Sequence, residues 1–149
     1  MRTFRHSFLV NTEIEQVWKF YTNIRHLEVI SPPDLRIRVL KSTHQELQQG
    51  SEVWLTGKLV TRSNWHSRIT VLKPYEYVDE MISGRFKLWK HTHRFLDSKD
   101  GKTEVIDEID FALRYGFLGR LFEGVVMNRL RQVFVHRNEA TKAYFENTR

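Results

Sequence analysis

The sequence contains no cysteine among its 149 residues. Disulfide bonds, thiolate metal sites and catalytic thiols are therefore excluded. The N-terminal residues lack the apolar core of a signal peptide, and no stretch is apolar over the length of a membrane span. We therefore expect a soluble, cytoplasmic protein that contacts membranes at most transiently.

Common catalytic and binding signatures are also missing. There is no Gly-rich phosphate loop, no Gly-x-Ser-x-Gly motif and no His-Glu-x-x-His motif. The net charge is +6, but no run of five or more charges occurs, which favours a solvated surface over an acidic partner. No basic stripe is interleaved with aromatic residues on one face, so nucleic-acid binding is not expected. We predict no cofactor and no metal, and the oligomeric state is left open.

A long amphipathic helix is the dominant feature that is present. From Leu118 to Phe145, apolar residues recur at spacings of three and four, with polar residues between them. At 1.5 Å per residue this helix would be roughly 40 Å long, enough to cross a domain. The chain before it reads mainly as strands, so the helix is the expected cover of a large sheet.

Alternation of apolar and polar residues predicts seven strands, separated by turn signals. Their expected ranges are 3–10, 35–41, 51–60, 64–72, 75–82, 86–96 and 103–113. Two short helices are expected after the first strand, the first of them with a capping box formed by Thr12 and Glu15. Successive strands joined by short turns pair antiparallel, so the predicted class is α+β, in one domain over residues 1–149.

Six short stretches carry a resemblance to a known superfamily: residues 17–23, 30–33, 79–80, 84–86, 89–95 and 115–119. Together with the order of elements, they resemble the START-like or Bet v 1-like helix-grip domains. The resemblance is to the bacterial SRPBCC proteins of the polyketide cyclase/dehydrase type in particular, and it covers essentially the whole chain. The chain departs from the family pattern at Arg85 and Arg114, where that pattern often has proline.

The resemblance implies a curved seven-stranded antiparallel sheet that grips the C-terminal helix around an apolar cavity. Members of the superfamily bind lipids, sterols, quinones, hormones or polyketides in that cavity, and a minority catalyse cyclisation or dehydration. The resemblance thus indicates the fold, whereas the ligand of this chain is not identified by it.

The expected strand over residues 86–96 carries the most informative polar side chains. Alternation places Trp89, His91, His93 and Phe95 on one face, with charged and polar residues on the other. Because aromatic residues flank the two histidines, both histidines are expected to point inward. A three-residue turn with glycine in the left-handed position then sets the register with the next strand. The predicted cross-strand pairs are His93 with Asp107, His91 with Ile109, and Phe95 with Val105.

An inward pair of His93 and Asp107 has three interpretations. The two side chains form a structural hydrogen bond, or they orient a polar group of a ligand, or they act in acid–base catalysis with the carboxylate orienting His93 as the base. A metal site would need a third ligand beside His91 and His93, and Asp107 is the visible candidate for it. The metal interpretation is the weakest of these.

The long helix would supply either the roof of a cavity or one side of a solid core. Met127 is the most adaptable of its inward residues, because an unbranched thioether fits irregular space. The residues expected to contact a ligand are Trp89, His91, His93, Phe95, Asp107, Ile109, Phe122, Val126, Met127, Leu130 and Phe134.

Three functions remain open at this point. The leading hypothesis is a binding module that holds a hydrophobic small molecule, such as a lipid, a quinone or a polyketide-like compound, between sheet and helix. The second is an aromatase/cyclase-like or dehydratase-like enzyme with His93 as base and Asp107 as its orienting partner. The third is a protein-interaction domain with a filled core. Periodicity does not distinguish a lined cavity from a packed core, so the space between sheet and helix decides among them.

Overall fold

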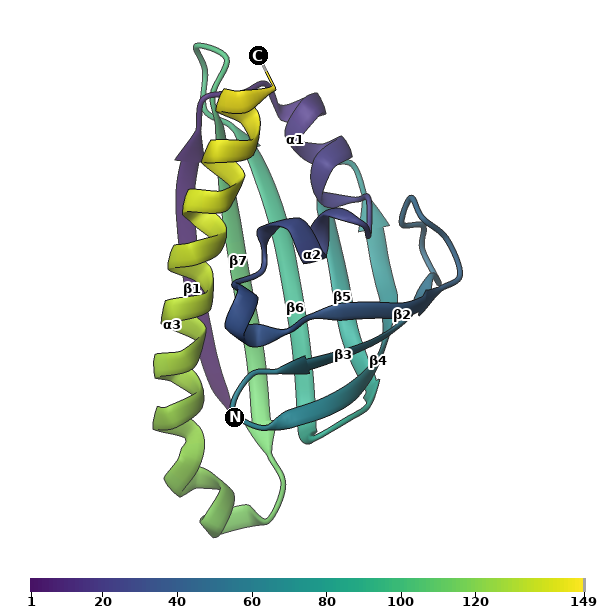
Figure 1. Ribbon diagram of the computed structural model, residues 1–149, viewed down its shortest axis with the longest axis vertical. Coiled ribbons are helices and arrows are strands. Elements are labelled where there is room, and N and C mark those ends of the chain that lie inside the picture. Colours follow the sequence, from purple (N-terminus) through teal and green to yellow (C-terminus); the bar gives the residue numbers. More distant parts are fainter. Residues whose placement is uncertain (149) are drawn as a thin grey trace.

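The computed structural model describes residues 1–148. Figure 1 shows the long helix α3 running along one side of a sheet, beside β1 and β7, while the short helices α1 and α2 lie nearer the middle. The elements in chain order are β1 (Arg2–Val10), α1 (Ile14–Tyr21), α2 (His26–Ile30), the 3₁₀ turn η1 (Pro33–Leu35), β2 (Arg38–Ser42), β3 (Glu52–Lys58), β4 (Arg62–Lys73), β5 (Glu76–Ser83), β6 (Phe86–Asp97), β7 (Thr103–Leu113) and α3 (Gly116–Asn147).

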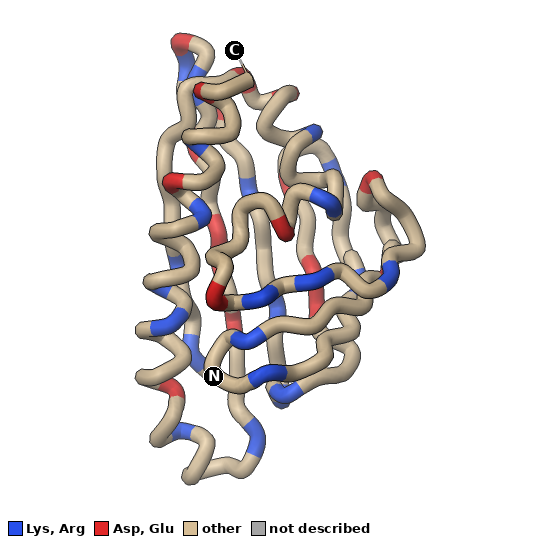
Figure 2. Tube along the Cα trace, viewed as in Figure 1, with Lys and Arg blue, Asp and Glu red and all other residues tan. Residues whose placement is uncertain are grey.

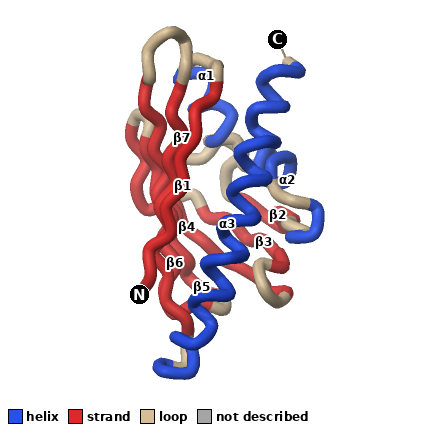
Figure 3. The backbone as a smooth tube through the Cα atoms, turned by 90° about the vertical axis from the view of Figure 1, so that its left-hand side faces the viewer, coloured by secondary structure: helices blue, strands red, loops and turns tan. Residues whose placement is uncertain are grey.

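The sheet is antiparallel throughout, with the strand order β1-β7-β6-β5-β4-β3-β2. It curves far enough for the C-terminal end of β3 to approach the helix. The carbonyl of Leu59, just after β3, accepts a 2.7 Å hydrogen bond from Nε of Arg129 in α3. Nη1 of the same arginine lies 3.0 Å from the carboxylate of Asp34. The predicted architecture, a curved seven-stranded sheet around a long C-terminal helix, is confirmed (Figure 3).

The predicted first residue of one strand, β2, was wrong. The strand expected over residues 35–41 begins only at Arg38, because Leu35 belongs to η1 and Arg36 adopts a left-handed conformation with φ of 50°. The alternation of apolar residues had extended the strand through this turn. The other strands and the long helix agree with the predicted ranges to within two residues at each end.

The predicted capping box at the start of α1 does not form. Glu13 is the N-cap residue, and Oγ1 of Thr12 is buried without a hydrogen-bond partner among the described residues. The backbone carbonyl of Thr12 accepts a 2.7 Å hydrogen bond from the hydroxyl of Thr103 instead. Glu15 accepts a hydrogen bond from the hydroxyl of Tyr75. Contacts with β7 and with the turn between β4 and β5 have therefore replaced the local capping interactions.

Apolar packing is concentrated in two clusters, one toward each end of the inner face of α3. The first cluster includes Phe8, Phe20, Phe95 and Phe145. The second cluster includes Phe86, Trp89, Phe111 and Phe134. Between them the buried residues of the sheet are polar, namely His91, His93 and Asp107.

Charged residues are spread over the surface, as the sequence predicted. Figure 2 shows Lys and Arg on helices, strands and turns alike. Among the described residues, no helix combines the length and the apolar character needed to cross a membrane.

Two glycines of α3 lead to opposite predictions for the same substitution. A Cβ on Gly119 would collide with the backbone carbonyl oxygen of Arg114, whereas a Cβ on Gly124 would meet open space. We expect Gly119→Ala to lower the free energy of unfolding by about 1–3 kcal/mol. Gly124→Ala should raise it by roughly 0.5–1 kcal/mol, because alanine restricts the unfolded chain and favours helix. Urea denaturation of the two variants measures whether the free energy of unfolding falls in one and rises in the other. Equal changes in the two variants would contradict the close approach of Gly119 to the backbone of Arg114.

Candidate functional site

A cavity of about 160 Å³ lies between α3 and the sheet. Leu130, Val133 and Phe134 line it from the helix, and Trp89 and Ile109 line it from the sheet. An engineered cavity of roughly 150 Å³, lined by Leu, Ile and Phe, binds benzene. The space in this chain therefore fits a single aromatic ring or a short branched chain.

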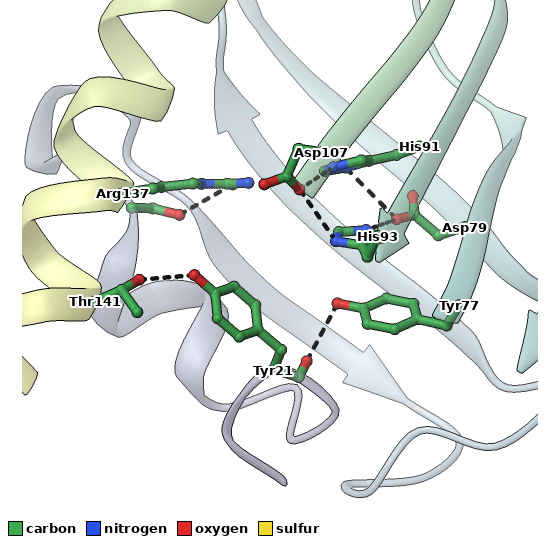
Figure 4. Close-up of polar contacts among 9 residues, drawn as sticks. Tyr21, Tyr77, Asp79, His91, His93, Asp107, Arg137 and Thr141 are labelled. Carbon is green, nitrogen blue, oxygen red and sulfur yellow. Dashed lines mark hydrogen bonds and ion pairs between the residues drawn. The ribbon is translucent and has the colours of Figure 1, made fainter. Parts of the chain in front are cut away.

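Four titratable side chains on neighbouring strands form a polar cluster in the cavity wall (Figure 4). Asp79 comes from β5, His91 and His93 from β6, and Asp107 from β7. Nε2 of His91 lies 2.7 Å from Oδ1 of Asp107, and Nε2 of His93 lies 2.8 Å from Oδ2 of Asp79. The Nδ1 contacts are longer. Nδ1 of His93 lies 3.4 Å from Oδ1 of Asp107, and Nδ1 of His91 lies 3.8 Å from Oδ2 of Asp79. Each imidazole thus lies between the two carboxylates.

The predicted register of β6 and β7 is confirmed, but the shortest contacts run diagonally. His93 faces Asp107 and His91 faces Ile109 in the ladder. His91 nevertheless makes the short contact with Asp107, while His93 turns to Asp79 on the other neighbouring strand. Diagonal neighbours on one sheet face lie within reach of long side chains. The expected couple of His93 and Asp107 is therefore one link of a four-residue cluster rather than an isolated pair.

The two imidazoles belong to a stack of three rings. The ring centroids of His91 and His93 are 3.6 Å apart, and the ring of Tyr77 lies 4.0 Å from that of His93 on its other side. Two imidazoles so close would repel each other strongly if both were cationic. The stack therefore favours a single charge shared between two histidines.

The pKa values of the two histidines are shifted in opposite directions, as expected if they share a single charge. Burial lowers the pKa of His93, but the hydrogen bonds and charges of Asp107 and Asp79 outweigh burial, so the net pKa is raised. The pKa of His91 is lowered, first by burial and then by the charge on His93. Burial raises the pKa of each carboxyl group, yet the imidazole contacts leave both with a lowered pKa. The two histidines of the cluster therefore differ in basicity, because the pKa of His93 is raised and that of His91 is lowered.

These shifts predict opposite pH dependences for the two histidines. Because the pKa of His93 is raised above 6.5, its contribution to stability is complete below pH 6.5 and is lost as the pH rises through the folded-state pKa. His91 has a lowered pKa, so its contribution is complete above pH 6.5 and is lost as the pH falls. One proton changes the unfolding free energy by at most about 1.4 kcal/mol per pH unit.

We therefore expect His93→Gln to abolish the decline of stability above pH 6.5, and His91→Gln to weaken the decline below it. Urea denaturation across pH 5 to 9 measures both. An unchanged alkaline decline in His93→Gln would show that the proton is not held on His93.

A second set of polar groups faces this cluster across the cavity (Figure 4). The guanidinium of Arg137 in α3 lies 5.0 Å from the centroid of the Phe134 ring, and its Nη2 donates a 3.4 Å hydrogen bond to Oγ of Ser31. Nε of Arg137 is buried without a partner among the described residues. Nearby, the hydroxyls of Tyr21 and Thr141 lie 2.8 Å apart. The cavity thus contains a guanidinium with donor capacity left for a ligand.

Sequence reasoning missed Asp79 and Arg137. The spacing of residues could have placed both of them. Asp79 shares a strand face with Tyr77, and Arg137 follows Phe134 by three residues on the inner side of the helix. Their charge had favoured a solvated position. A charged residue on an otherwise apolar face is the signal that identifies them.

The structure brings together seven of the eleven residues expected to contact a ligand. Phe95 is buried instead in the first apolar cluster, where its ring packs against those of Trp18 and Tyr21. Phe122 is 61% exposed, because it lies on the first turns of α3 beyond the cavity. Val126 and Met127 are buried in the second apolar cluster. The seven that line the cavity are Trp89, His91, His93, Asp107, Ile109, Leu130 and Phe134.

Among the described residues, Asp79, His91 and His93 have the composition of a metal site. One candidate ligand atom from each lies within 4.8 Å of the others. The sequence had suggested Asp107 rather than Asp79 as the third ligand. The two imidazoles are stacked, however, and the in-plane lone pairs of stacked rings do not converge on one ion. This geometry favours hydrogen bonding, and the absence of a metal stays a prediction.

An antiparallel sheet wrapped around a long helix, with a partly polar cavity between them, defines the helix-grip class of domains. A profile of the family described as "Polyketide cyclase / dehydrase and lipid transport" matches residues 10–137. The chain therefore belongs to this family, within the START-like, SRPBCC superfamily that the sequence resembles. None of the curated proteins matches the chain significantly.

Solved structures share the fold at low sequence identity. A START superfamily protein from Mycobacterium smegmatis is 9% identical, with a TM-score of 0.75 and 99% of each chain covered. The Zhui aromatase/cyclase from a Streptomyces species is 17% identical, with a TM-score of 0.68, covering 95% of this chain and 89% of that one. Norcoclaurine synthase from Thalictrum flavum, solved with dopamine and hydroxybenzaldehyde, is 10% identical, with a TM-score of 0.74, covering 99% and 88%. At these identities the likeness concerns the fold alone.

Proposed function

We propose that the protein binds a small hydrophobic molecule in the cavity between α3 and the sheet. The observation that carries this proposal is the cavity itself, which lies between two packed apolar clusters and has polar groups in its wall. Apolar walls supply affinity, and a few placed polar groups orient the ligand. The cavity supports this proposal over an interaction domain with a filled core.

The polar wall indicates the chemistry of the ligand. The carboxylates of Asp79 and Asp107 are already engaged by imidazoles, whereas Arg137 retains a free donor. A ligand group that accepts hydrogen bonds complements the free donor of Arg137. We therefore propose a ligand whose ring or short chain carries a carbonyl or carboxylate oxygen.

A panel of three compounds of similar shape tests this proposal. Ethylbenzene, acetophenone and benzoate differ in the oxygen that they present. We expect all three to raise the melting temperature of the wild-type protein, with larger shifts for the two oxygen-bearing compounds. Arg137→Met should reduce that preference while keeping the response to ethylbenzene. If none of the three compounds shifts the melting temperature or binds in calorimetry, the cavity does not serve this purpose.

A second candidate function is cyclase- or dehydratase-like catalysis. His91, whose pKa is lowered, is held by Asp107 and stacks on His93, whose pKa is raised, so a candidate base and a candidate acid lie side by side. The raised pKa of His93 makes it the acid, so the role of base moves from His93, as first expected, to His91. Loss of water from a β-hydroxy ketone would use both residues, and His91→Gln and His93→Gln should each slow it. A rate indifferent to both substitutions would remove this candidate.

The extent and location of the protein are part of the proposal. We infer one domain, since all seven strands form a single sheet and α3 packs against β1 and β7 of that sheet. A cytoplasmic location stays a prediction from the sequence.

A further inference from the structure

Exposed apolar side chains gather where α3 begins. Tyr115 is 85% exposed, Phe117 74% and Phe122 61%. Figures 1 and 3 show that the loop after β7 and the first turns of α3 extend beyond the sheet at this end of the molecule. We call this end the tip, and its exposed apolar residues are Val60, Tyr115, Phe117, Leu118, Leu121, Phe122 and Val125.

The tip is basic. Between Asp110 and Glu139 the sequence has a single acidic residue, Glu123, and its carboxylate lies 3.7 Å from the guanidinium of Arg2. Figure 2 shows several basic positions at this end of the molecule, in the loop, on the helix and in the neighbouring turns. The exposed basic residues there are Lys58, Arg62, Arg85, Lys87, Arg114 and Arg120.

An apolar groove opens within the tip, between the β3–β4 turn and the start of α3. Phe86, Leu113 and Val126 are among the residues that line it. Leu59 and Trp65 line both this groove and the inner cavity, so the two spaces share a wall. Movement of these two side chains would connect the groove to the cavity.

The conformation of Tyr115 points to a role for its side chain. This residue has φ of 70°, a left-handed conformation that glycine or asparagine adopts at lower cost. With 85% of its surface exposed, the tyrosine gains little packing in return. Among the described side chains, none caps the first turn of α3, so its free amide groups add to the positive potential of the tip.

We infer that the tip docks on the surface of an anionic lipid bilayer. Aromatic and aliphatic side chains enter the headgroup region, and the surrounding arginines and lysines meet lipid phosphates. Self-association through the same patch would bring the arginines of two copies together, because a two-fold interface pairs each surface with itself. The charge of the tip thus favours a membrane over a second copy. The further idea that the groove admits ligand from the bilayer rests on the proposed function, whereas docking does not.

Vesicle sedimentation tests the inference with the full chain. The protein is mixed with vesicles of phosphatidylcholine alone or of phosphatidylcholine with phosphatidylglycerol. We expect binding to the anionic vesicles that weakens as salt is added, and little binding to the neutral ones. Phe117→Ser and Leu121→Ser should each weaken binding about tenfold or more, because each removes a large side chain from the inserted surface. Arg114→Glu combined with Arg120→Glu should abolish binding.

Matched controls lie at the opposite end of the molecule, beside the β6–β7 turn. Leu96→Ser repeats the leucine-to-serine change and Lys102→Glu reverses one positive charge, each at an exposed position, and both should leave vesicle binding unchanged. Val133→Phe, inside the cavity, should also leave it unchanged, so failure of docking is distinguished from failure of ligand binding.

Three results would overturn the inference. The first is a wild-type protein that stays in the supernatant with anionic vesicles at low salt. The second is a set of tip variants that sediment as the wild type does. The third is a wild-type dimer, detected by analytical ultracentrifugation, that the tip substitutions dissociate while vesicles remain unbound. That outcome would assign the tip to self-association.

Discussion

Replacing Asp107 by alanine is expected to lower the free energy of unfolding by about 3–5 kcal/mol at neutral pH. The carboxylate is almost fully buried and contacts both imidazoles of the cluster. Its removal leaves His91 without its closest partner, and it leaves Asp79 as the remaining carboxylate for His93 and Arg137. Removing one partner of a buried ion pair costs more than the pair contributes, since the other charge stays buried.

Urea denaturation measures this loss, and two further variants interpret it. Asp107→Asn keeps the size of the side chain and an accepting oxygen, so it isolates the effect of the charge and should cost less. Glu108→Ala removes the next carboxylate along β7, which points outward to Arg5 at 2.7 Å, and should change stability little because exposed pairs contribute little. If Asp107→Ala were no more harmful than Glu108→Ala, the cluster would not be the buried charged network described above.

Val133→Phe is expected to weaken ligand binding by a hundredfold or more, which corresponds to about 2.7 kcal/mol of binding free energy. Val133 lines the cavity from α3 and is 2% exposed. The added phenyl ring would occupy a cavity whose volume suits one aromatic ring. Because the ring enters empty space, the free energy of unfolding should change by less than about 1 kcal/mol. In a filled core the same overpacking would cost about 1–3 kcal/mol.

The measurements are calorimetric titration with acetophenone and urea denaturation of the same samples. Val135→Phe is the matched control, since Val135 lies on the same helix with its side chain exposed. Its affinity and stability should equal those of the wild type. A Val133→Phe variant that binds acetophenone normally would place the ligand elsewhere, and a strongly destabilised one would favour a filled core.

Much of the sheet could be predicted because its strands have one buried face. Alternation along β6 and a glycine in the left-handed position after it were enough to align His93 with Asp107, as the structure confirms. A shift by one residue would have turned every buried side chain outward, so the register is strongly determined. The direction of side chains beyond the backbone was not predictable in the same way. His91 and His93 reach the carboxylates diagonally. Their ring orientations also depend on tertiary packing, since the ring of His93 stacks on Tyr77 and that of His91 packs against Phe134.

The cavity lining was harder to predict than the strands. Helical spacing assigned Phe122 and Leu130 to the same inner face, but only Leu130 lies over the sheet, because α3 extends beyond it at the tip. The periodicity of apolar residues predicts which face of the helix a side chain lies on, but it does not predict which part of the sheet, if any, lies opposite that side chain. Asp79 and Arg137 were missed for the converse reason, since their burial depends on charged partners from other elements.

The most direct test of ligand binding in the cavity is native mass spectrometry of the wild-type protein and of Val133→Phe after incubation with acetophenone. We expect a complex of one acetophenone per chain for the wild type and an unliganded mass for the variant. Identical spectra for the two proteins, whether both liganded or both free, would contradict ligand binding in the cavity.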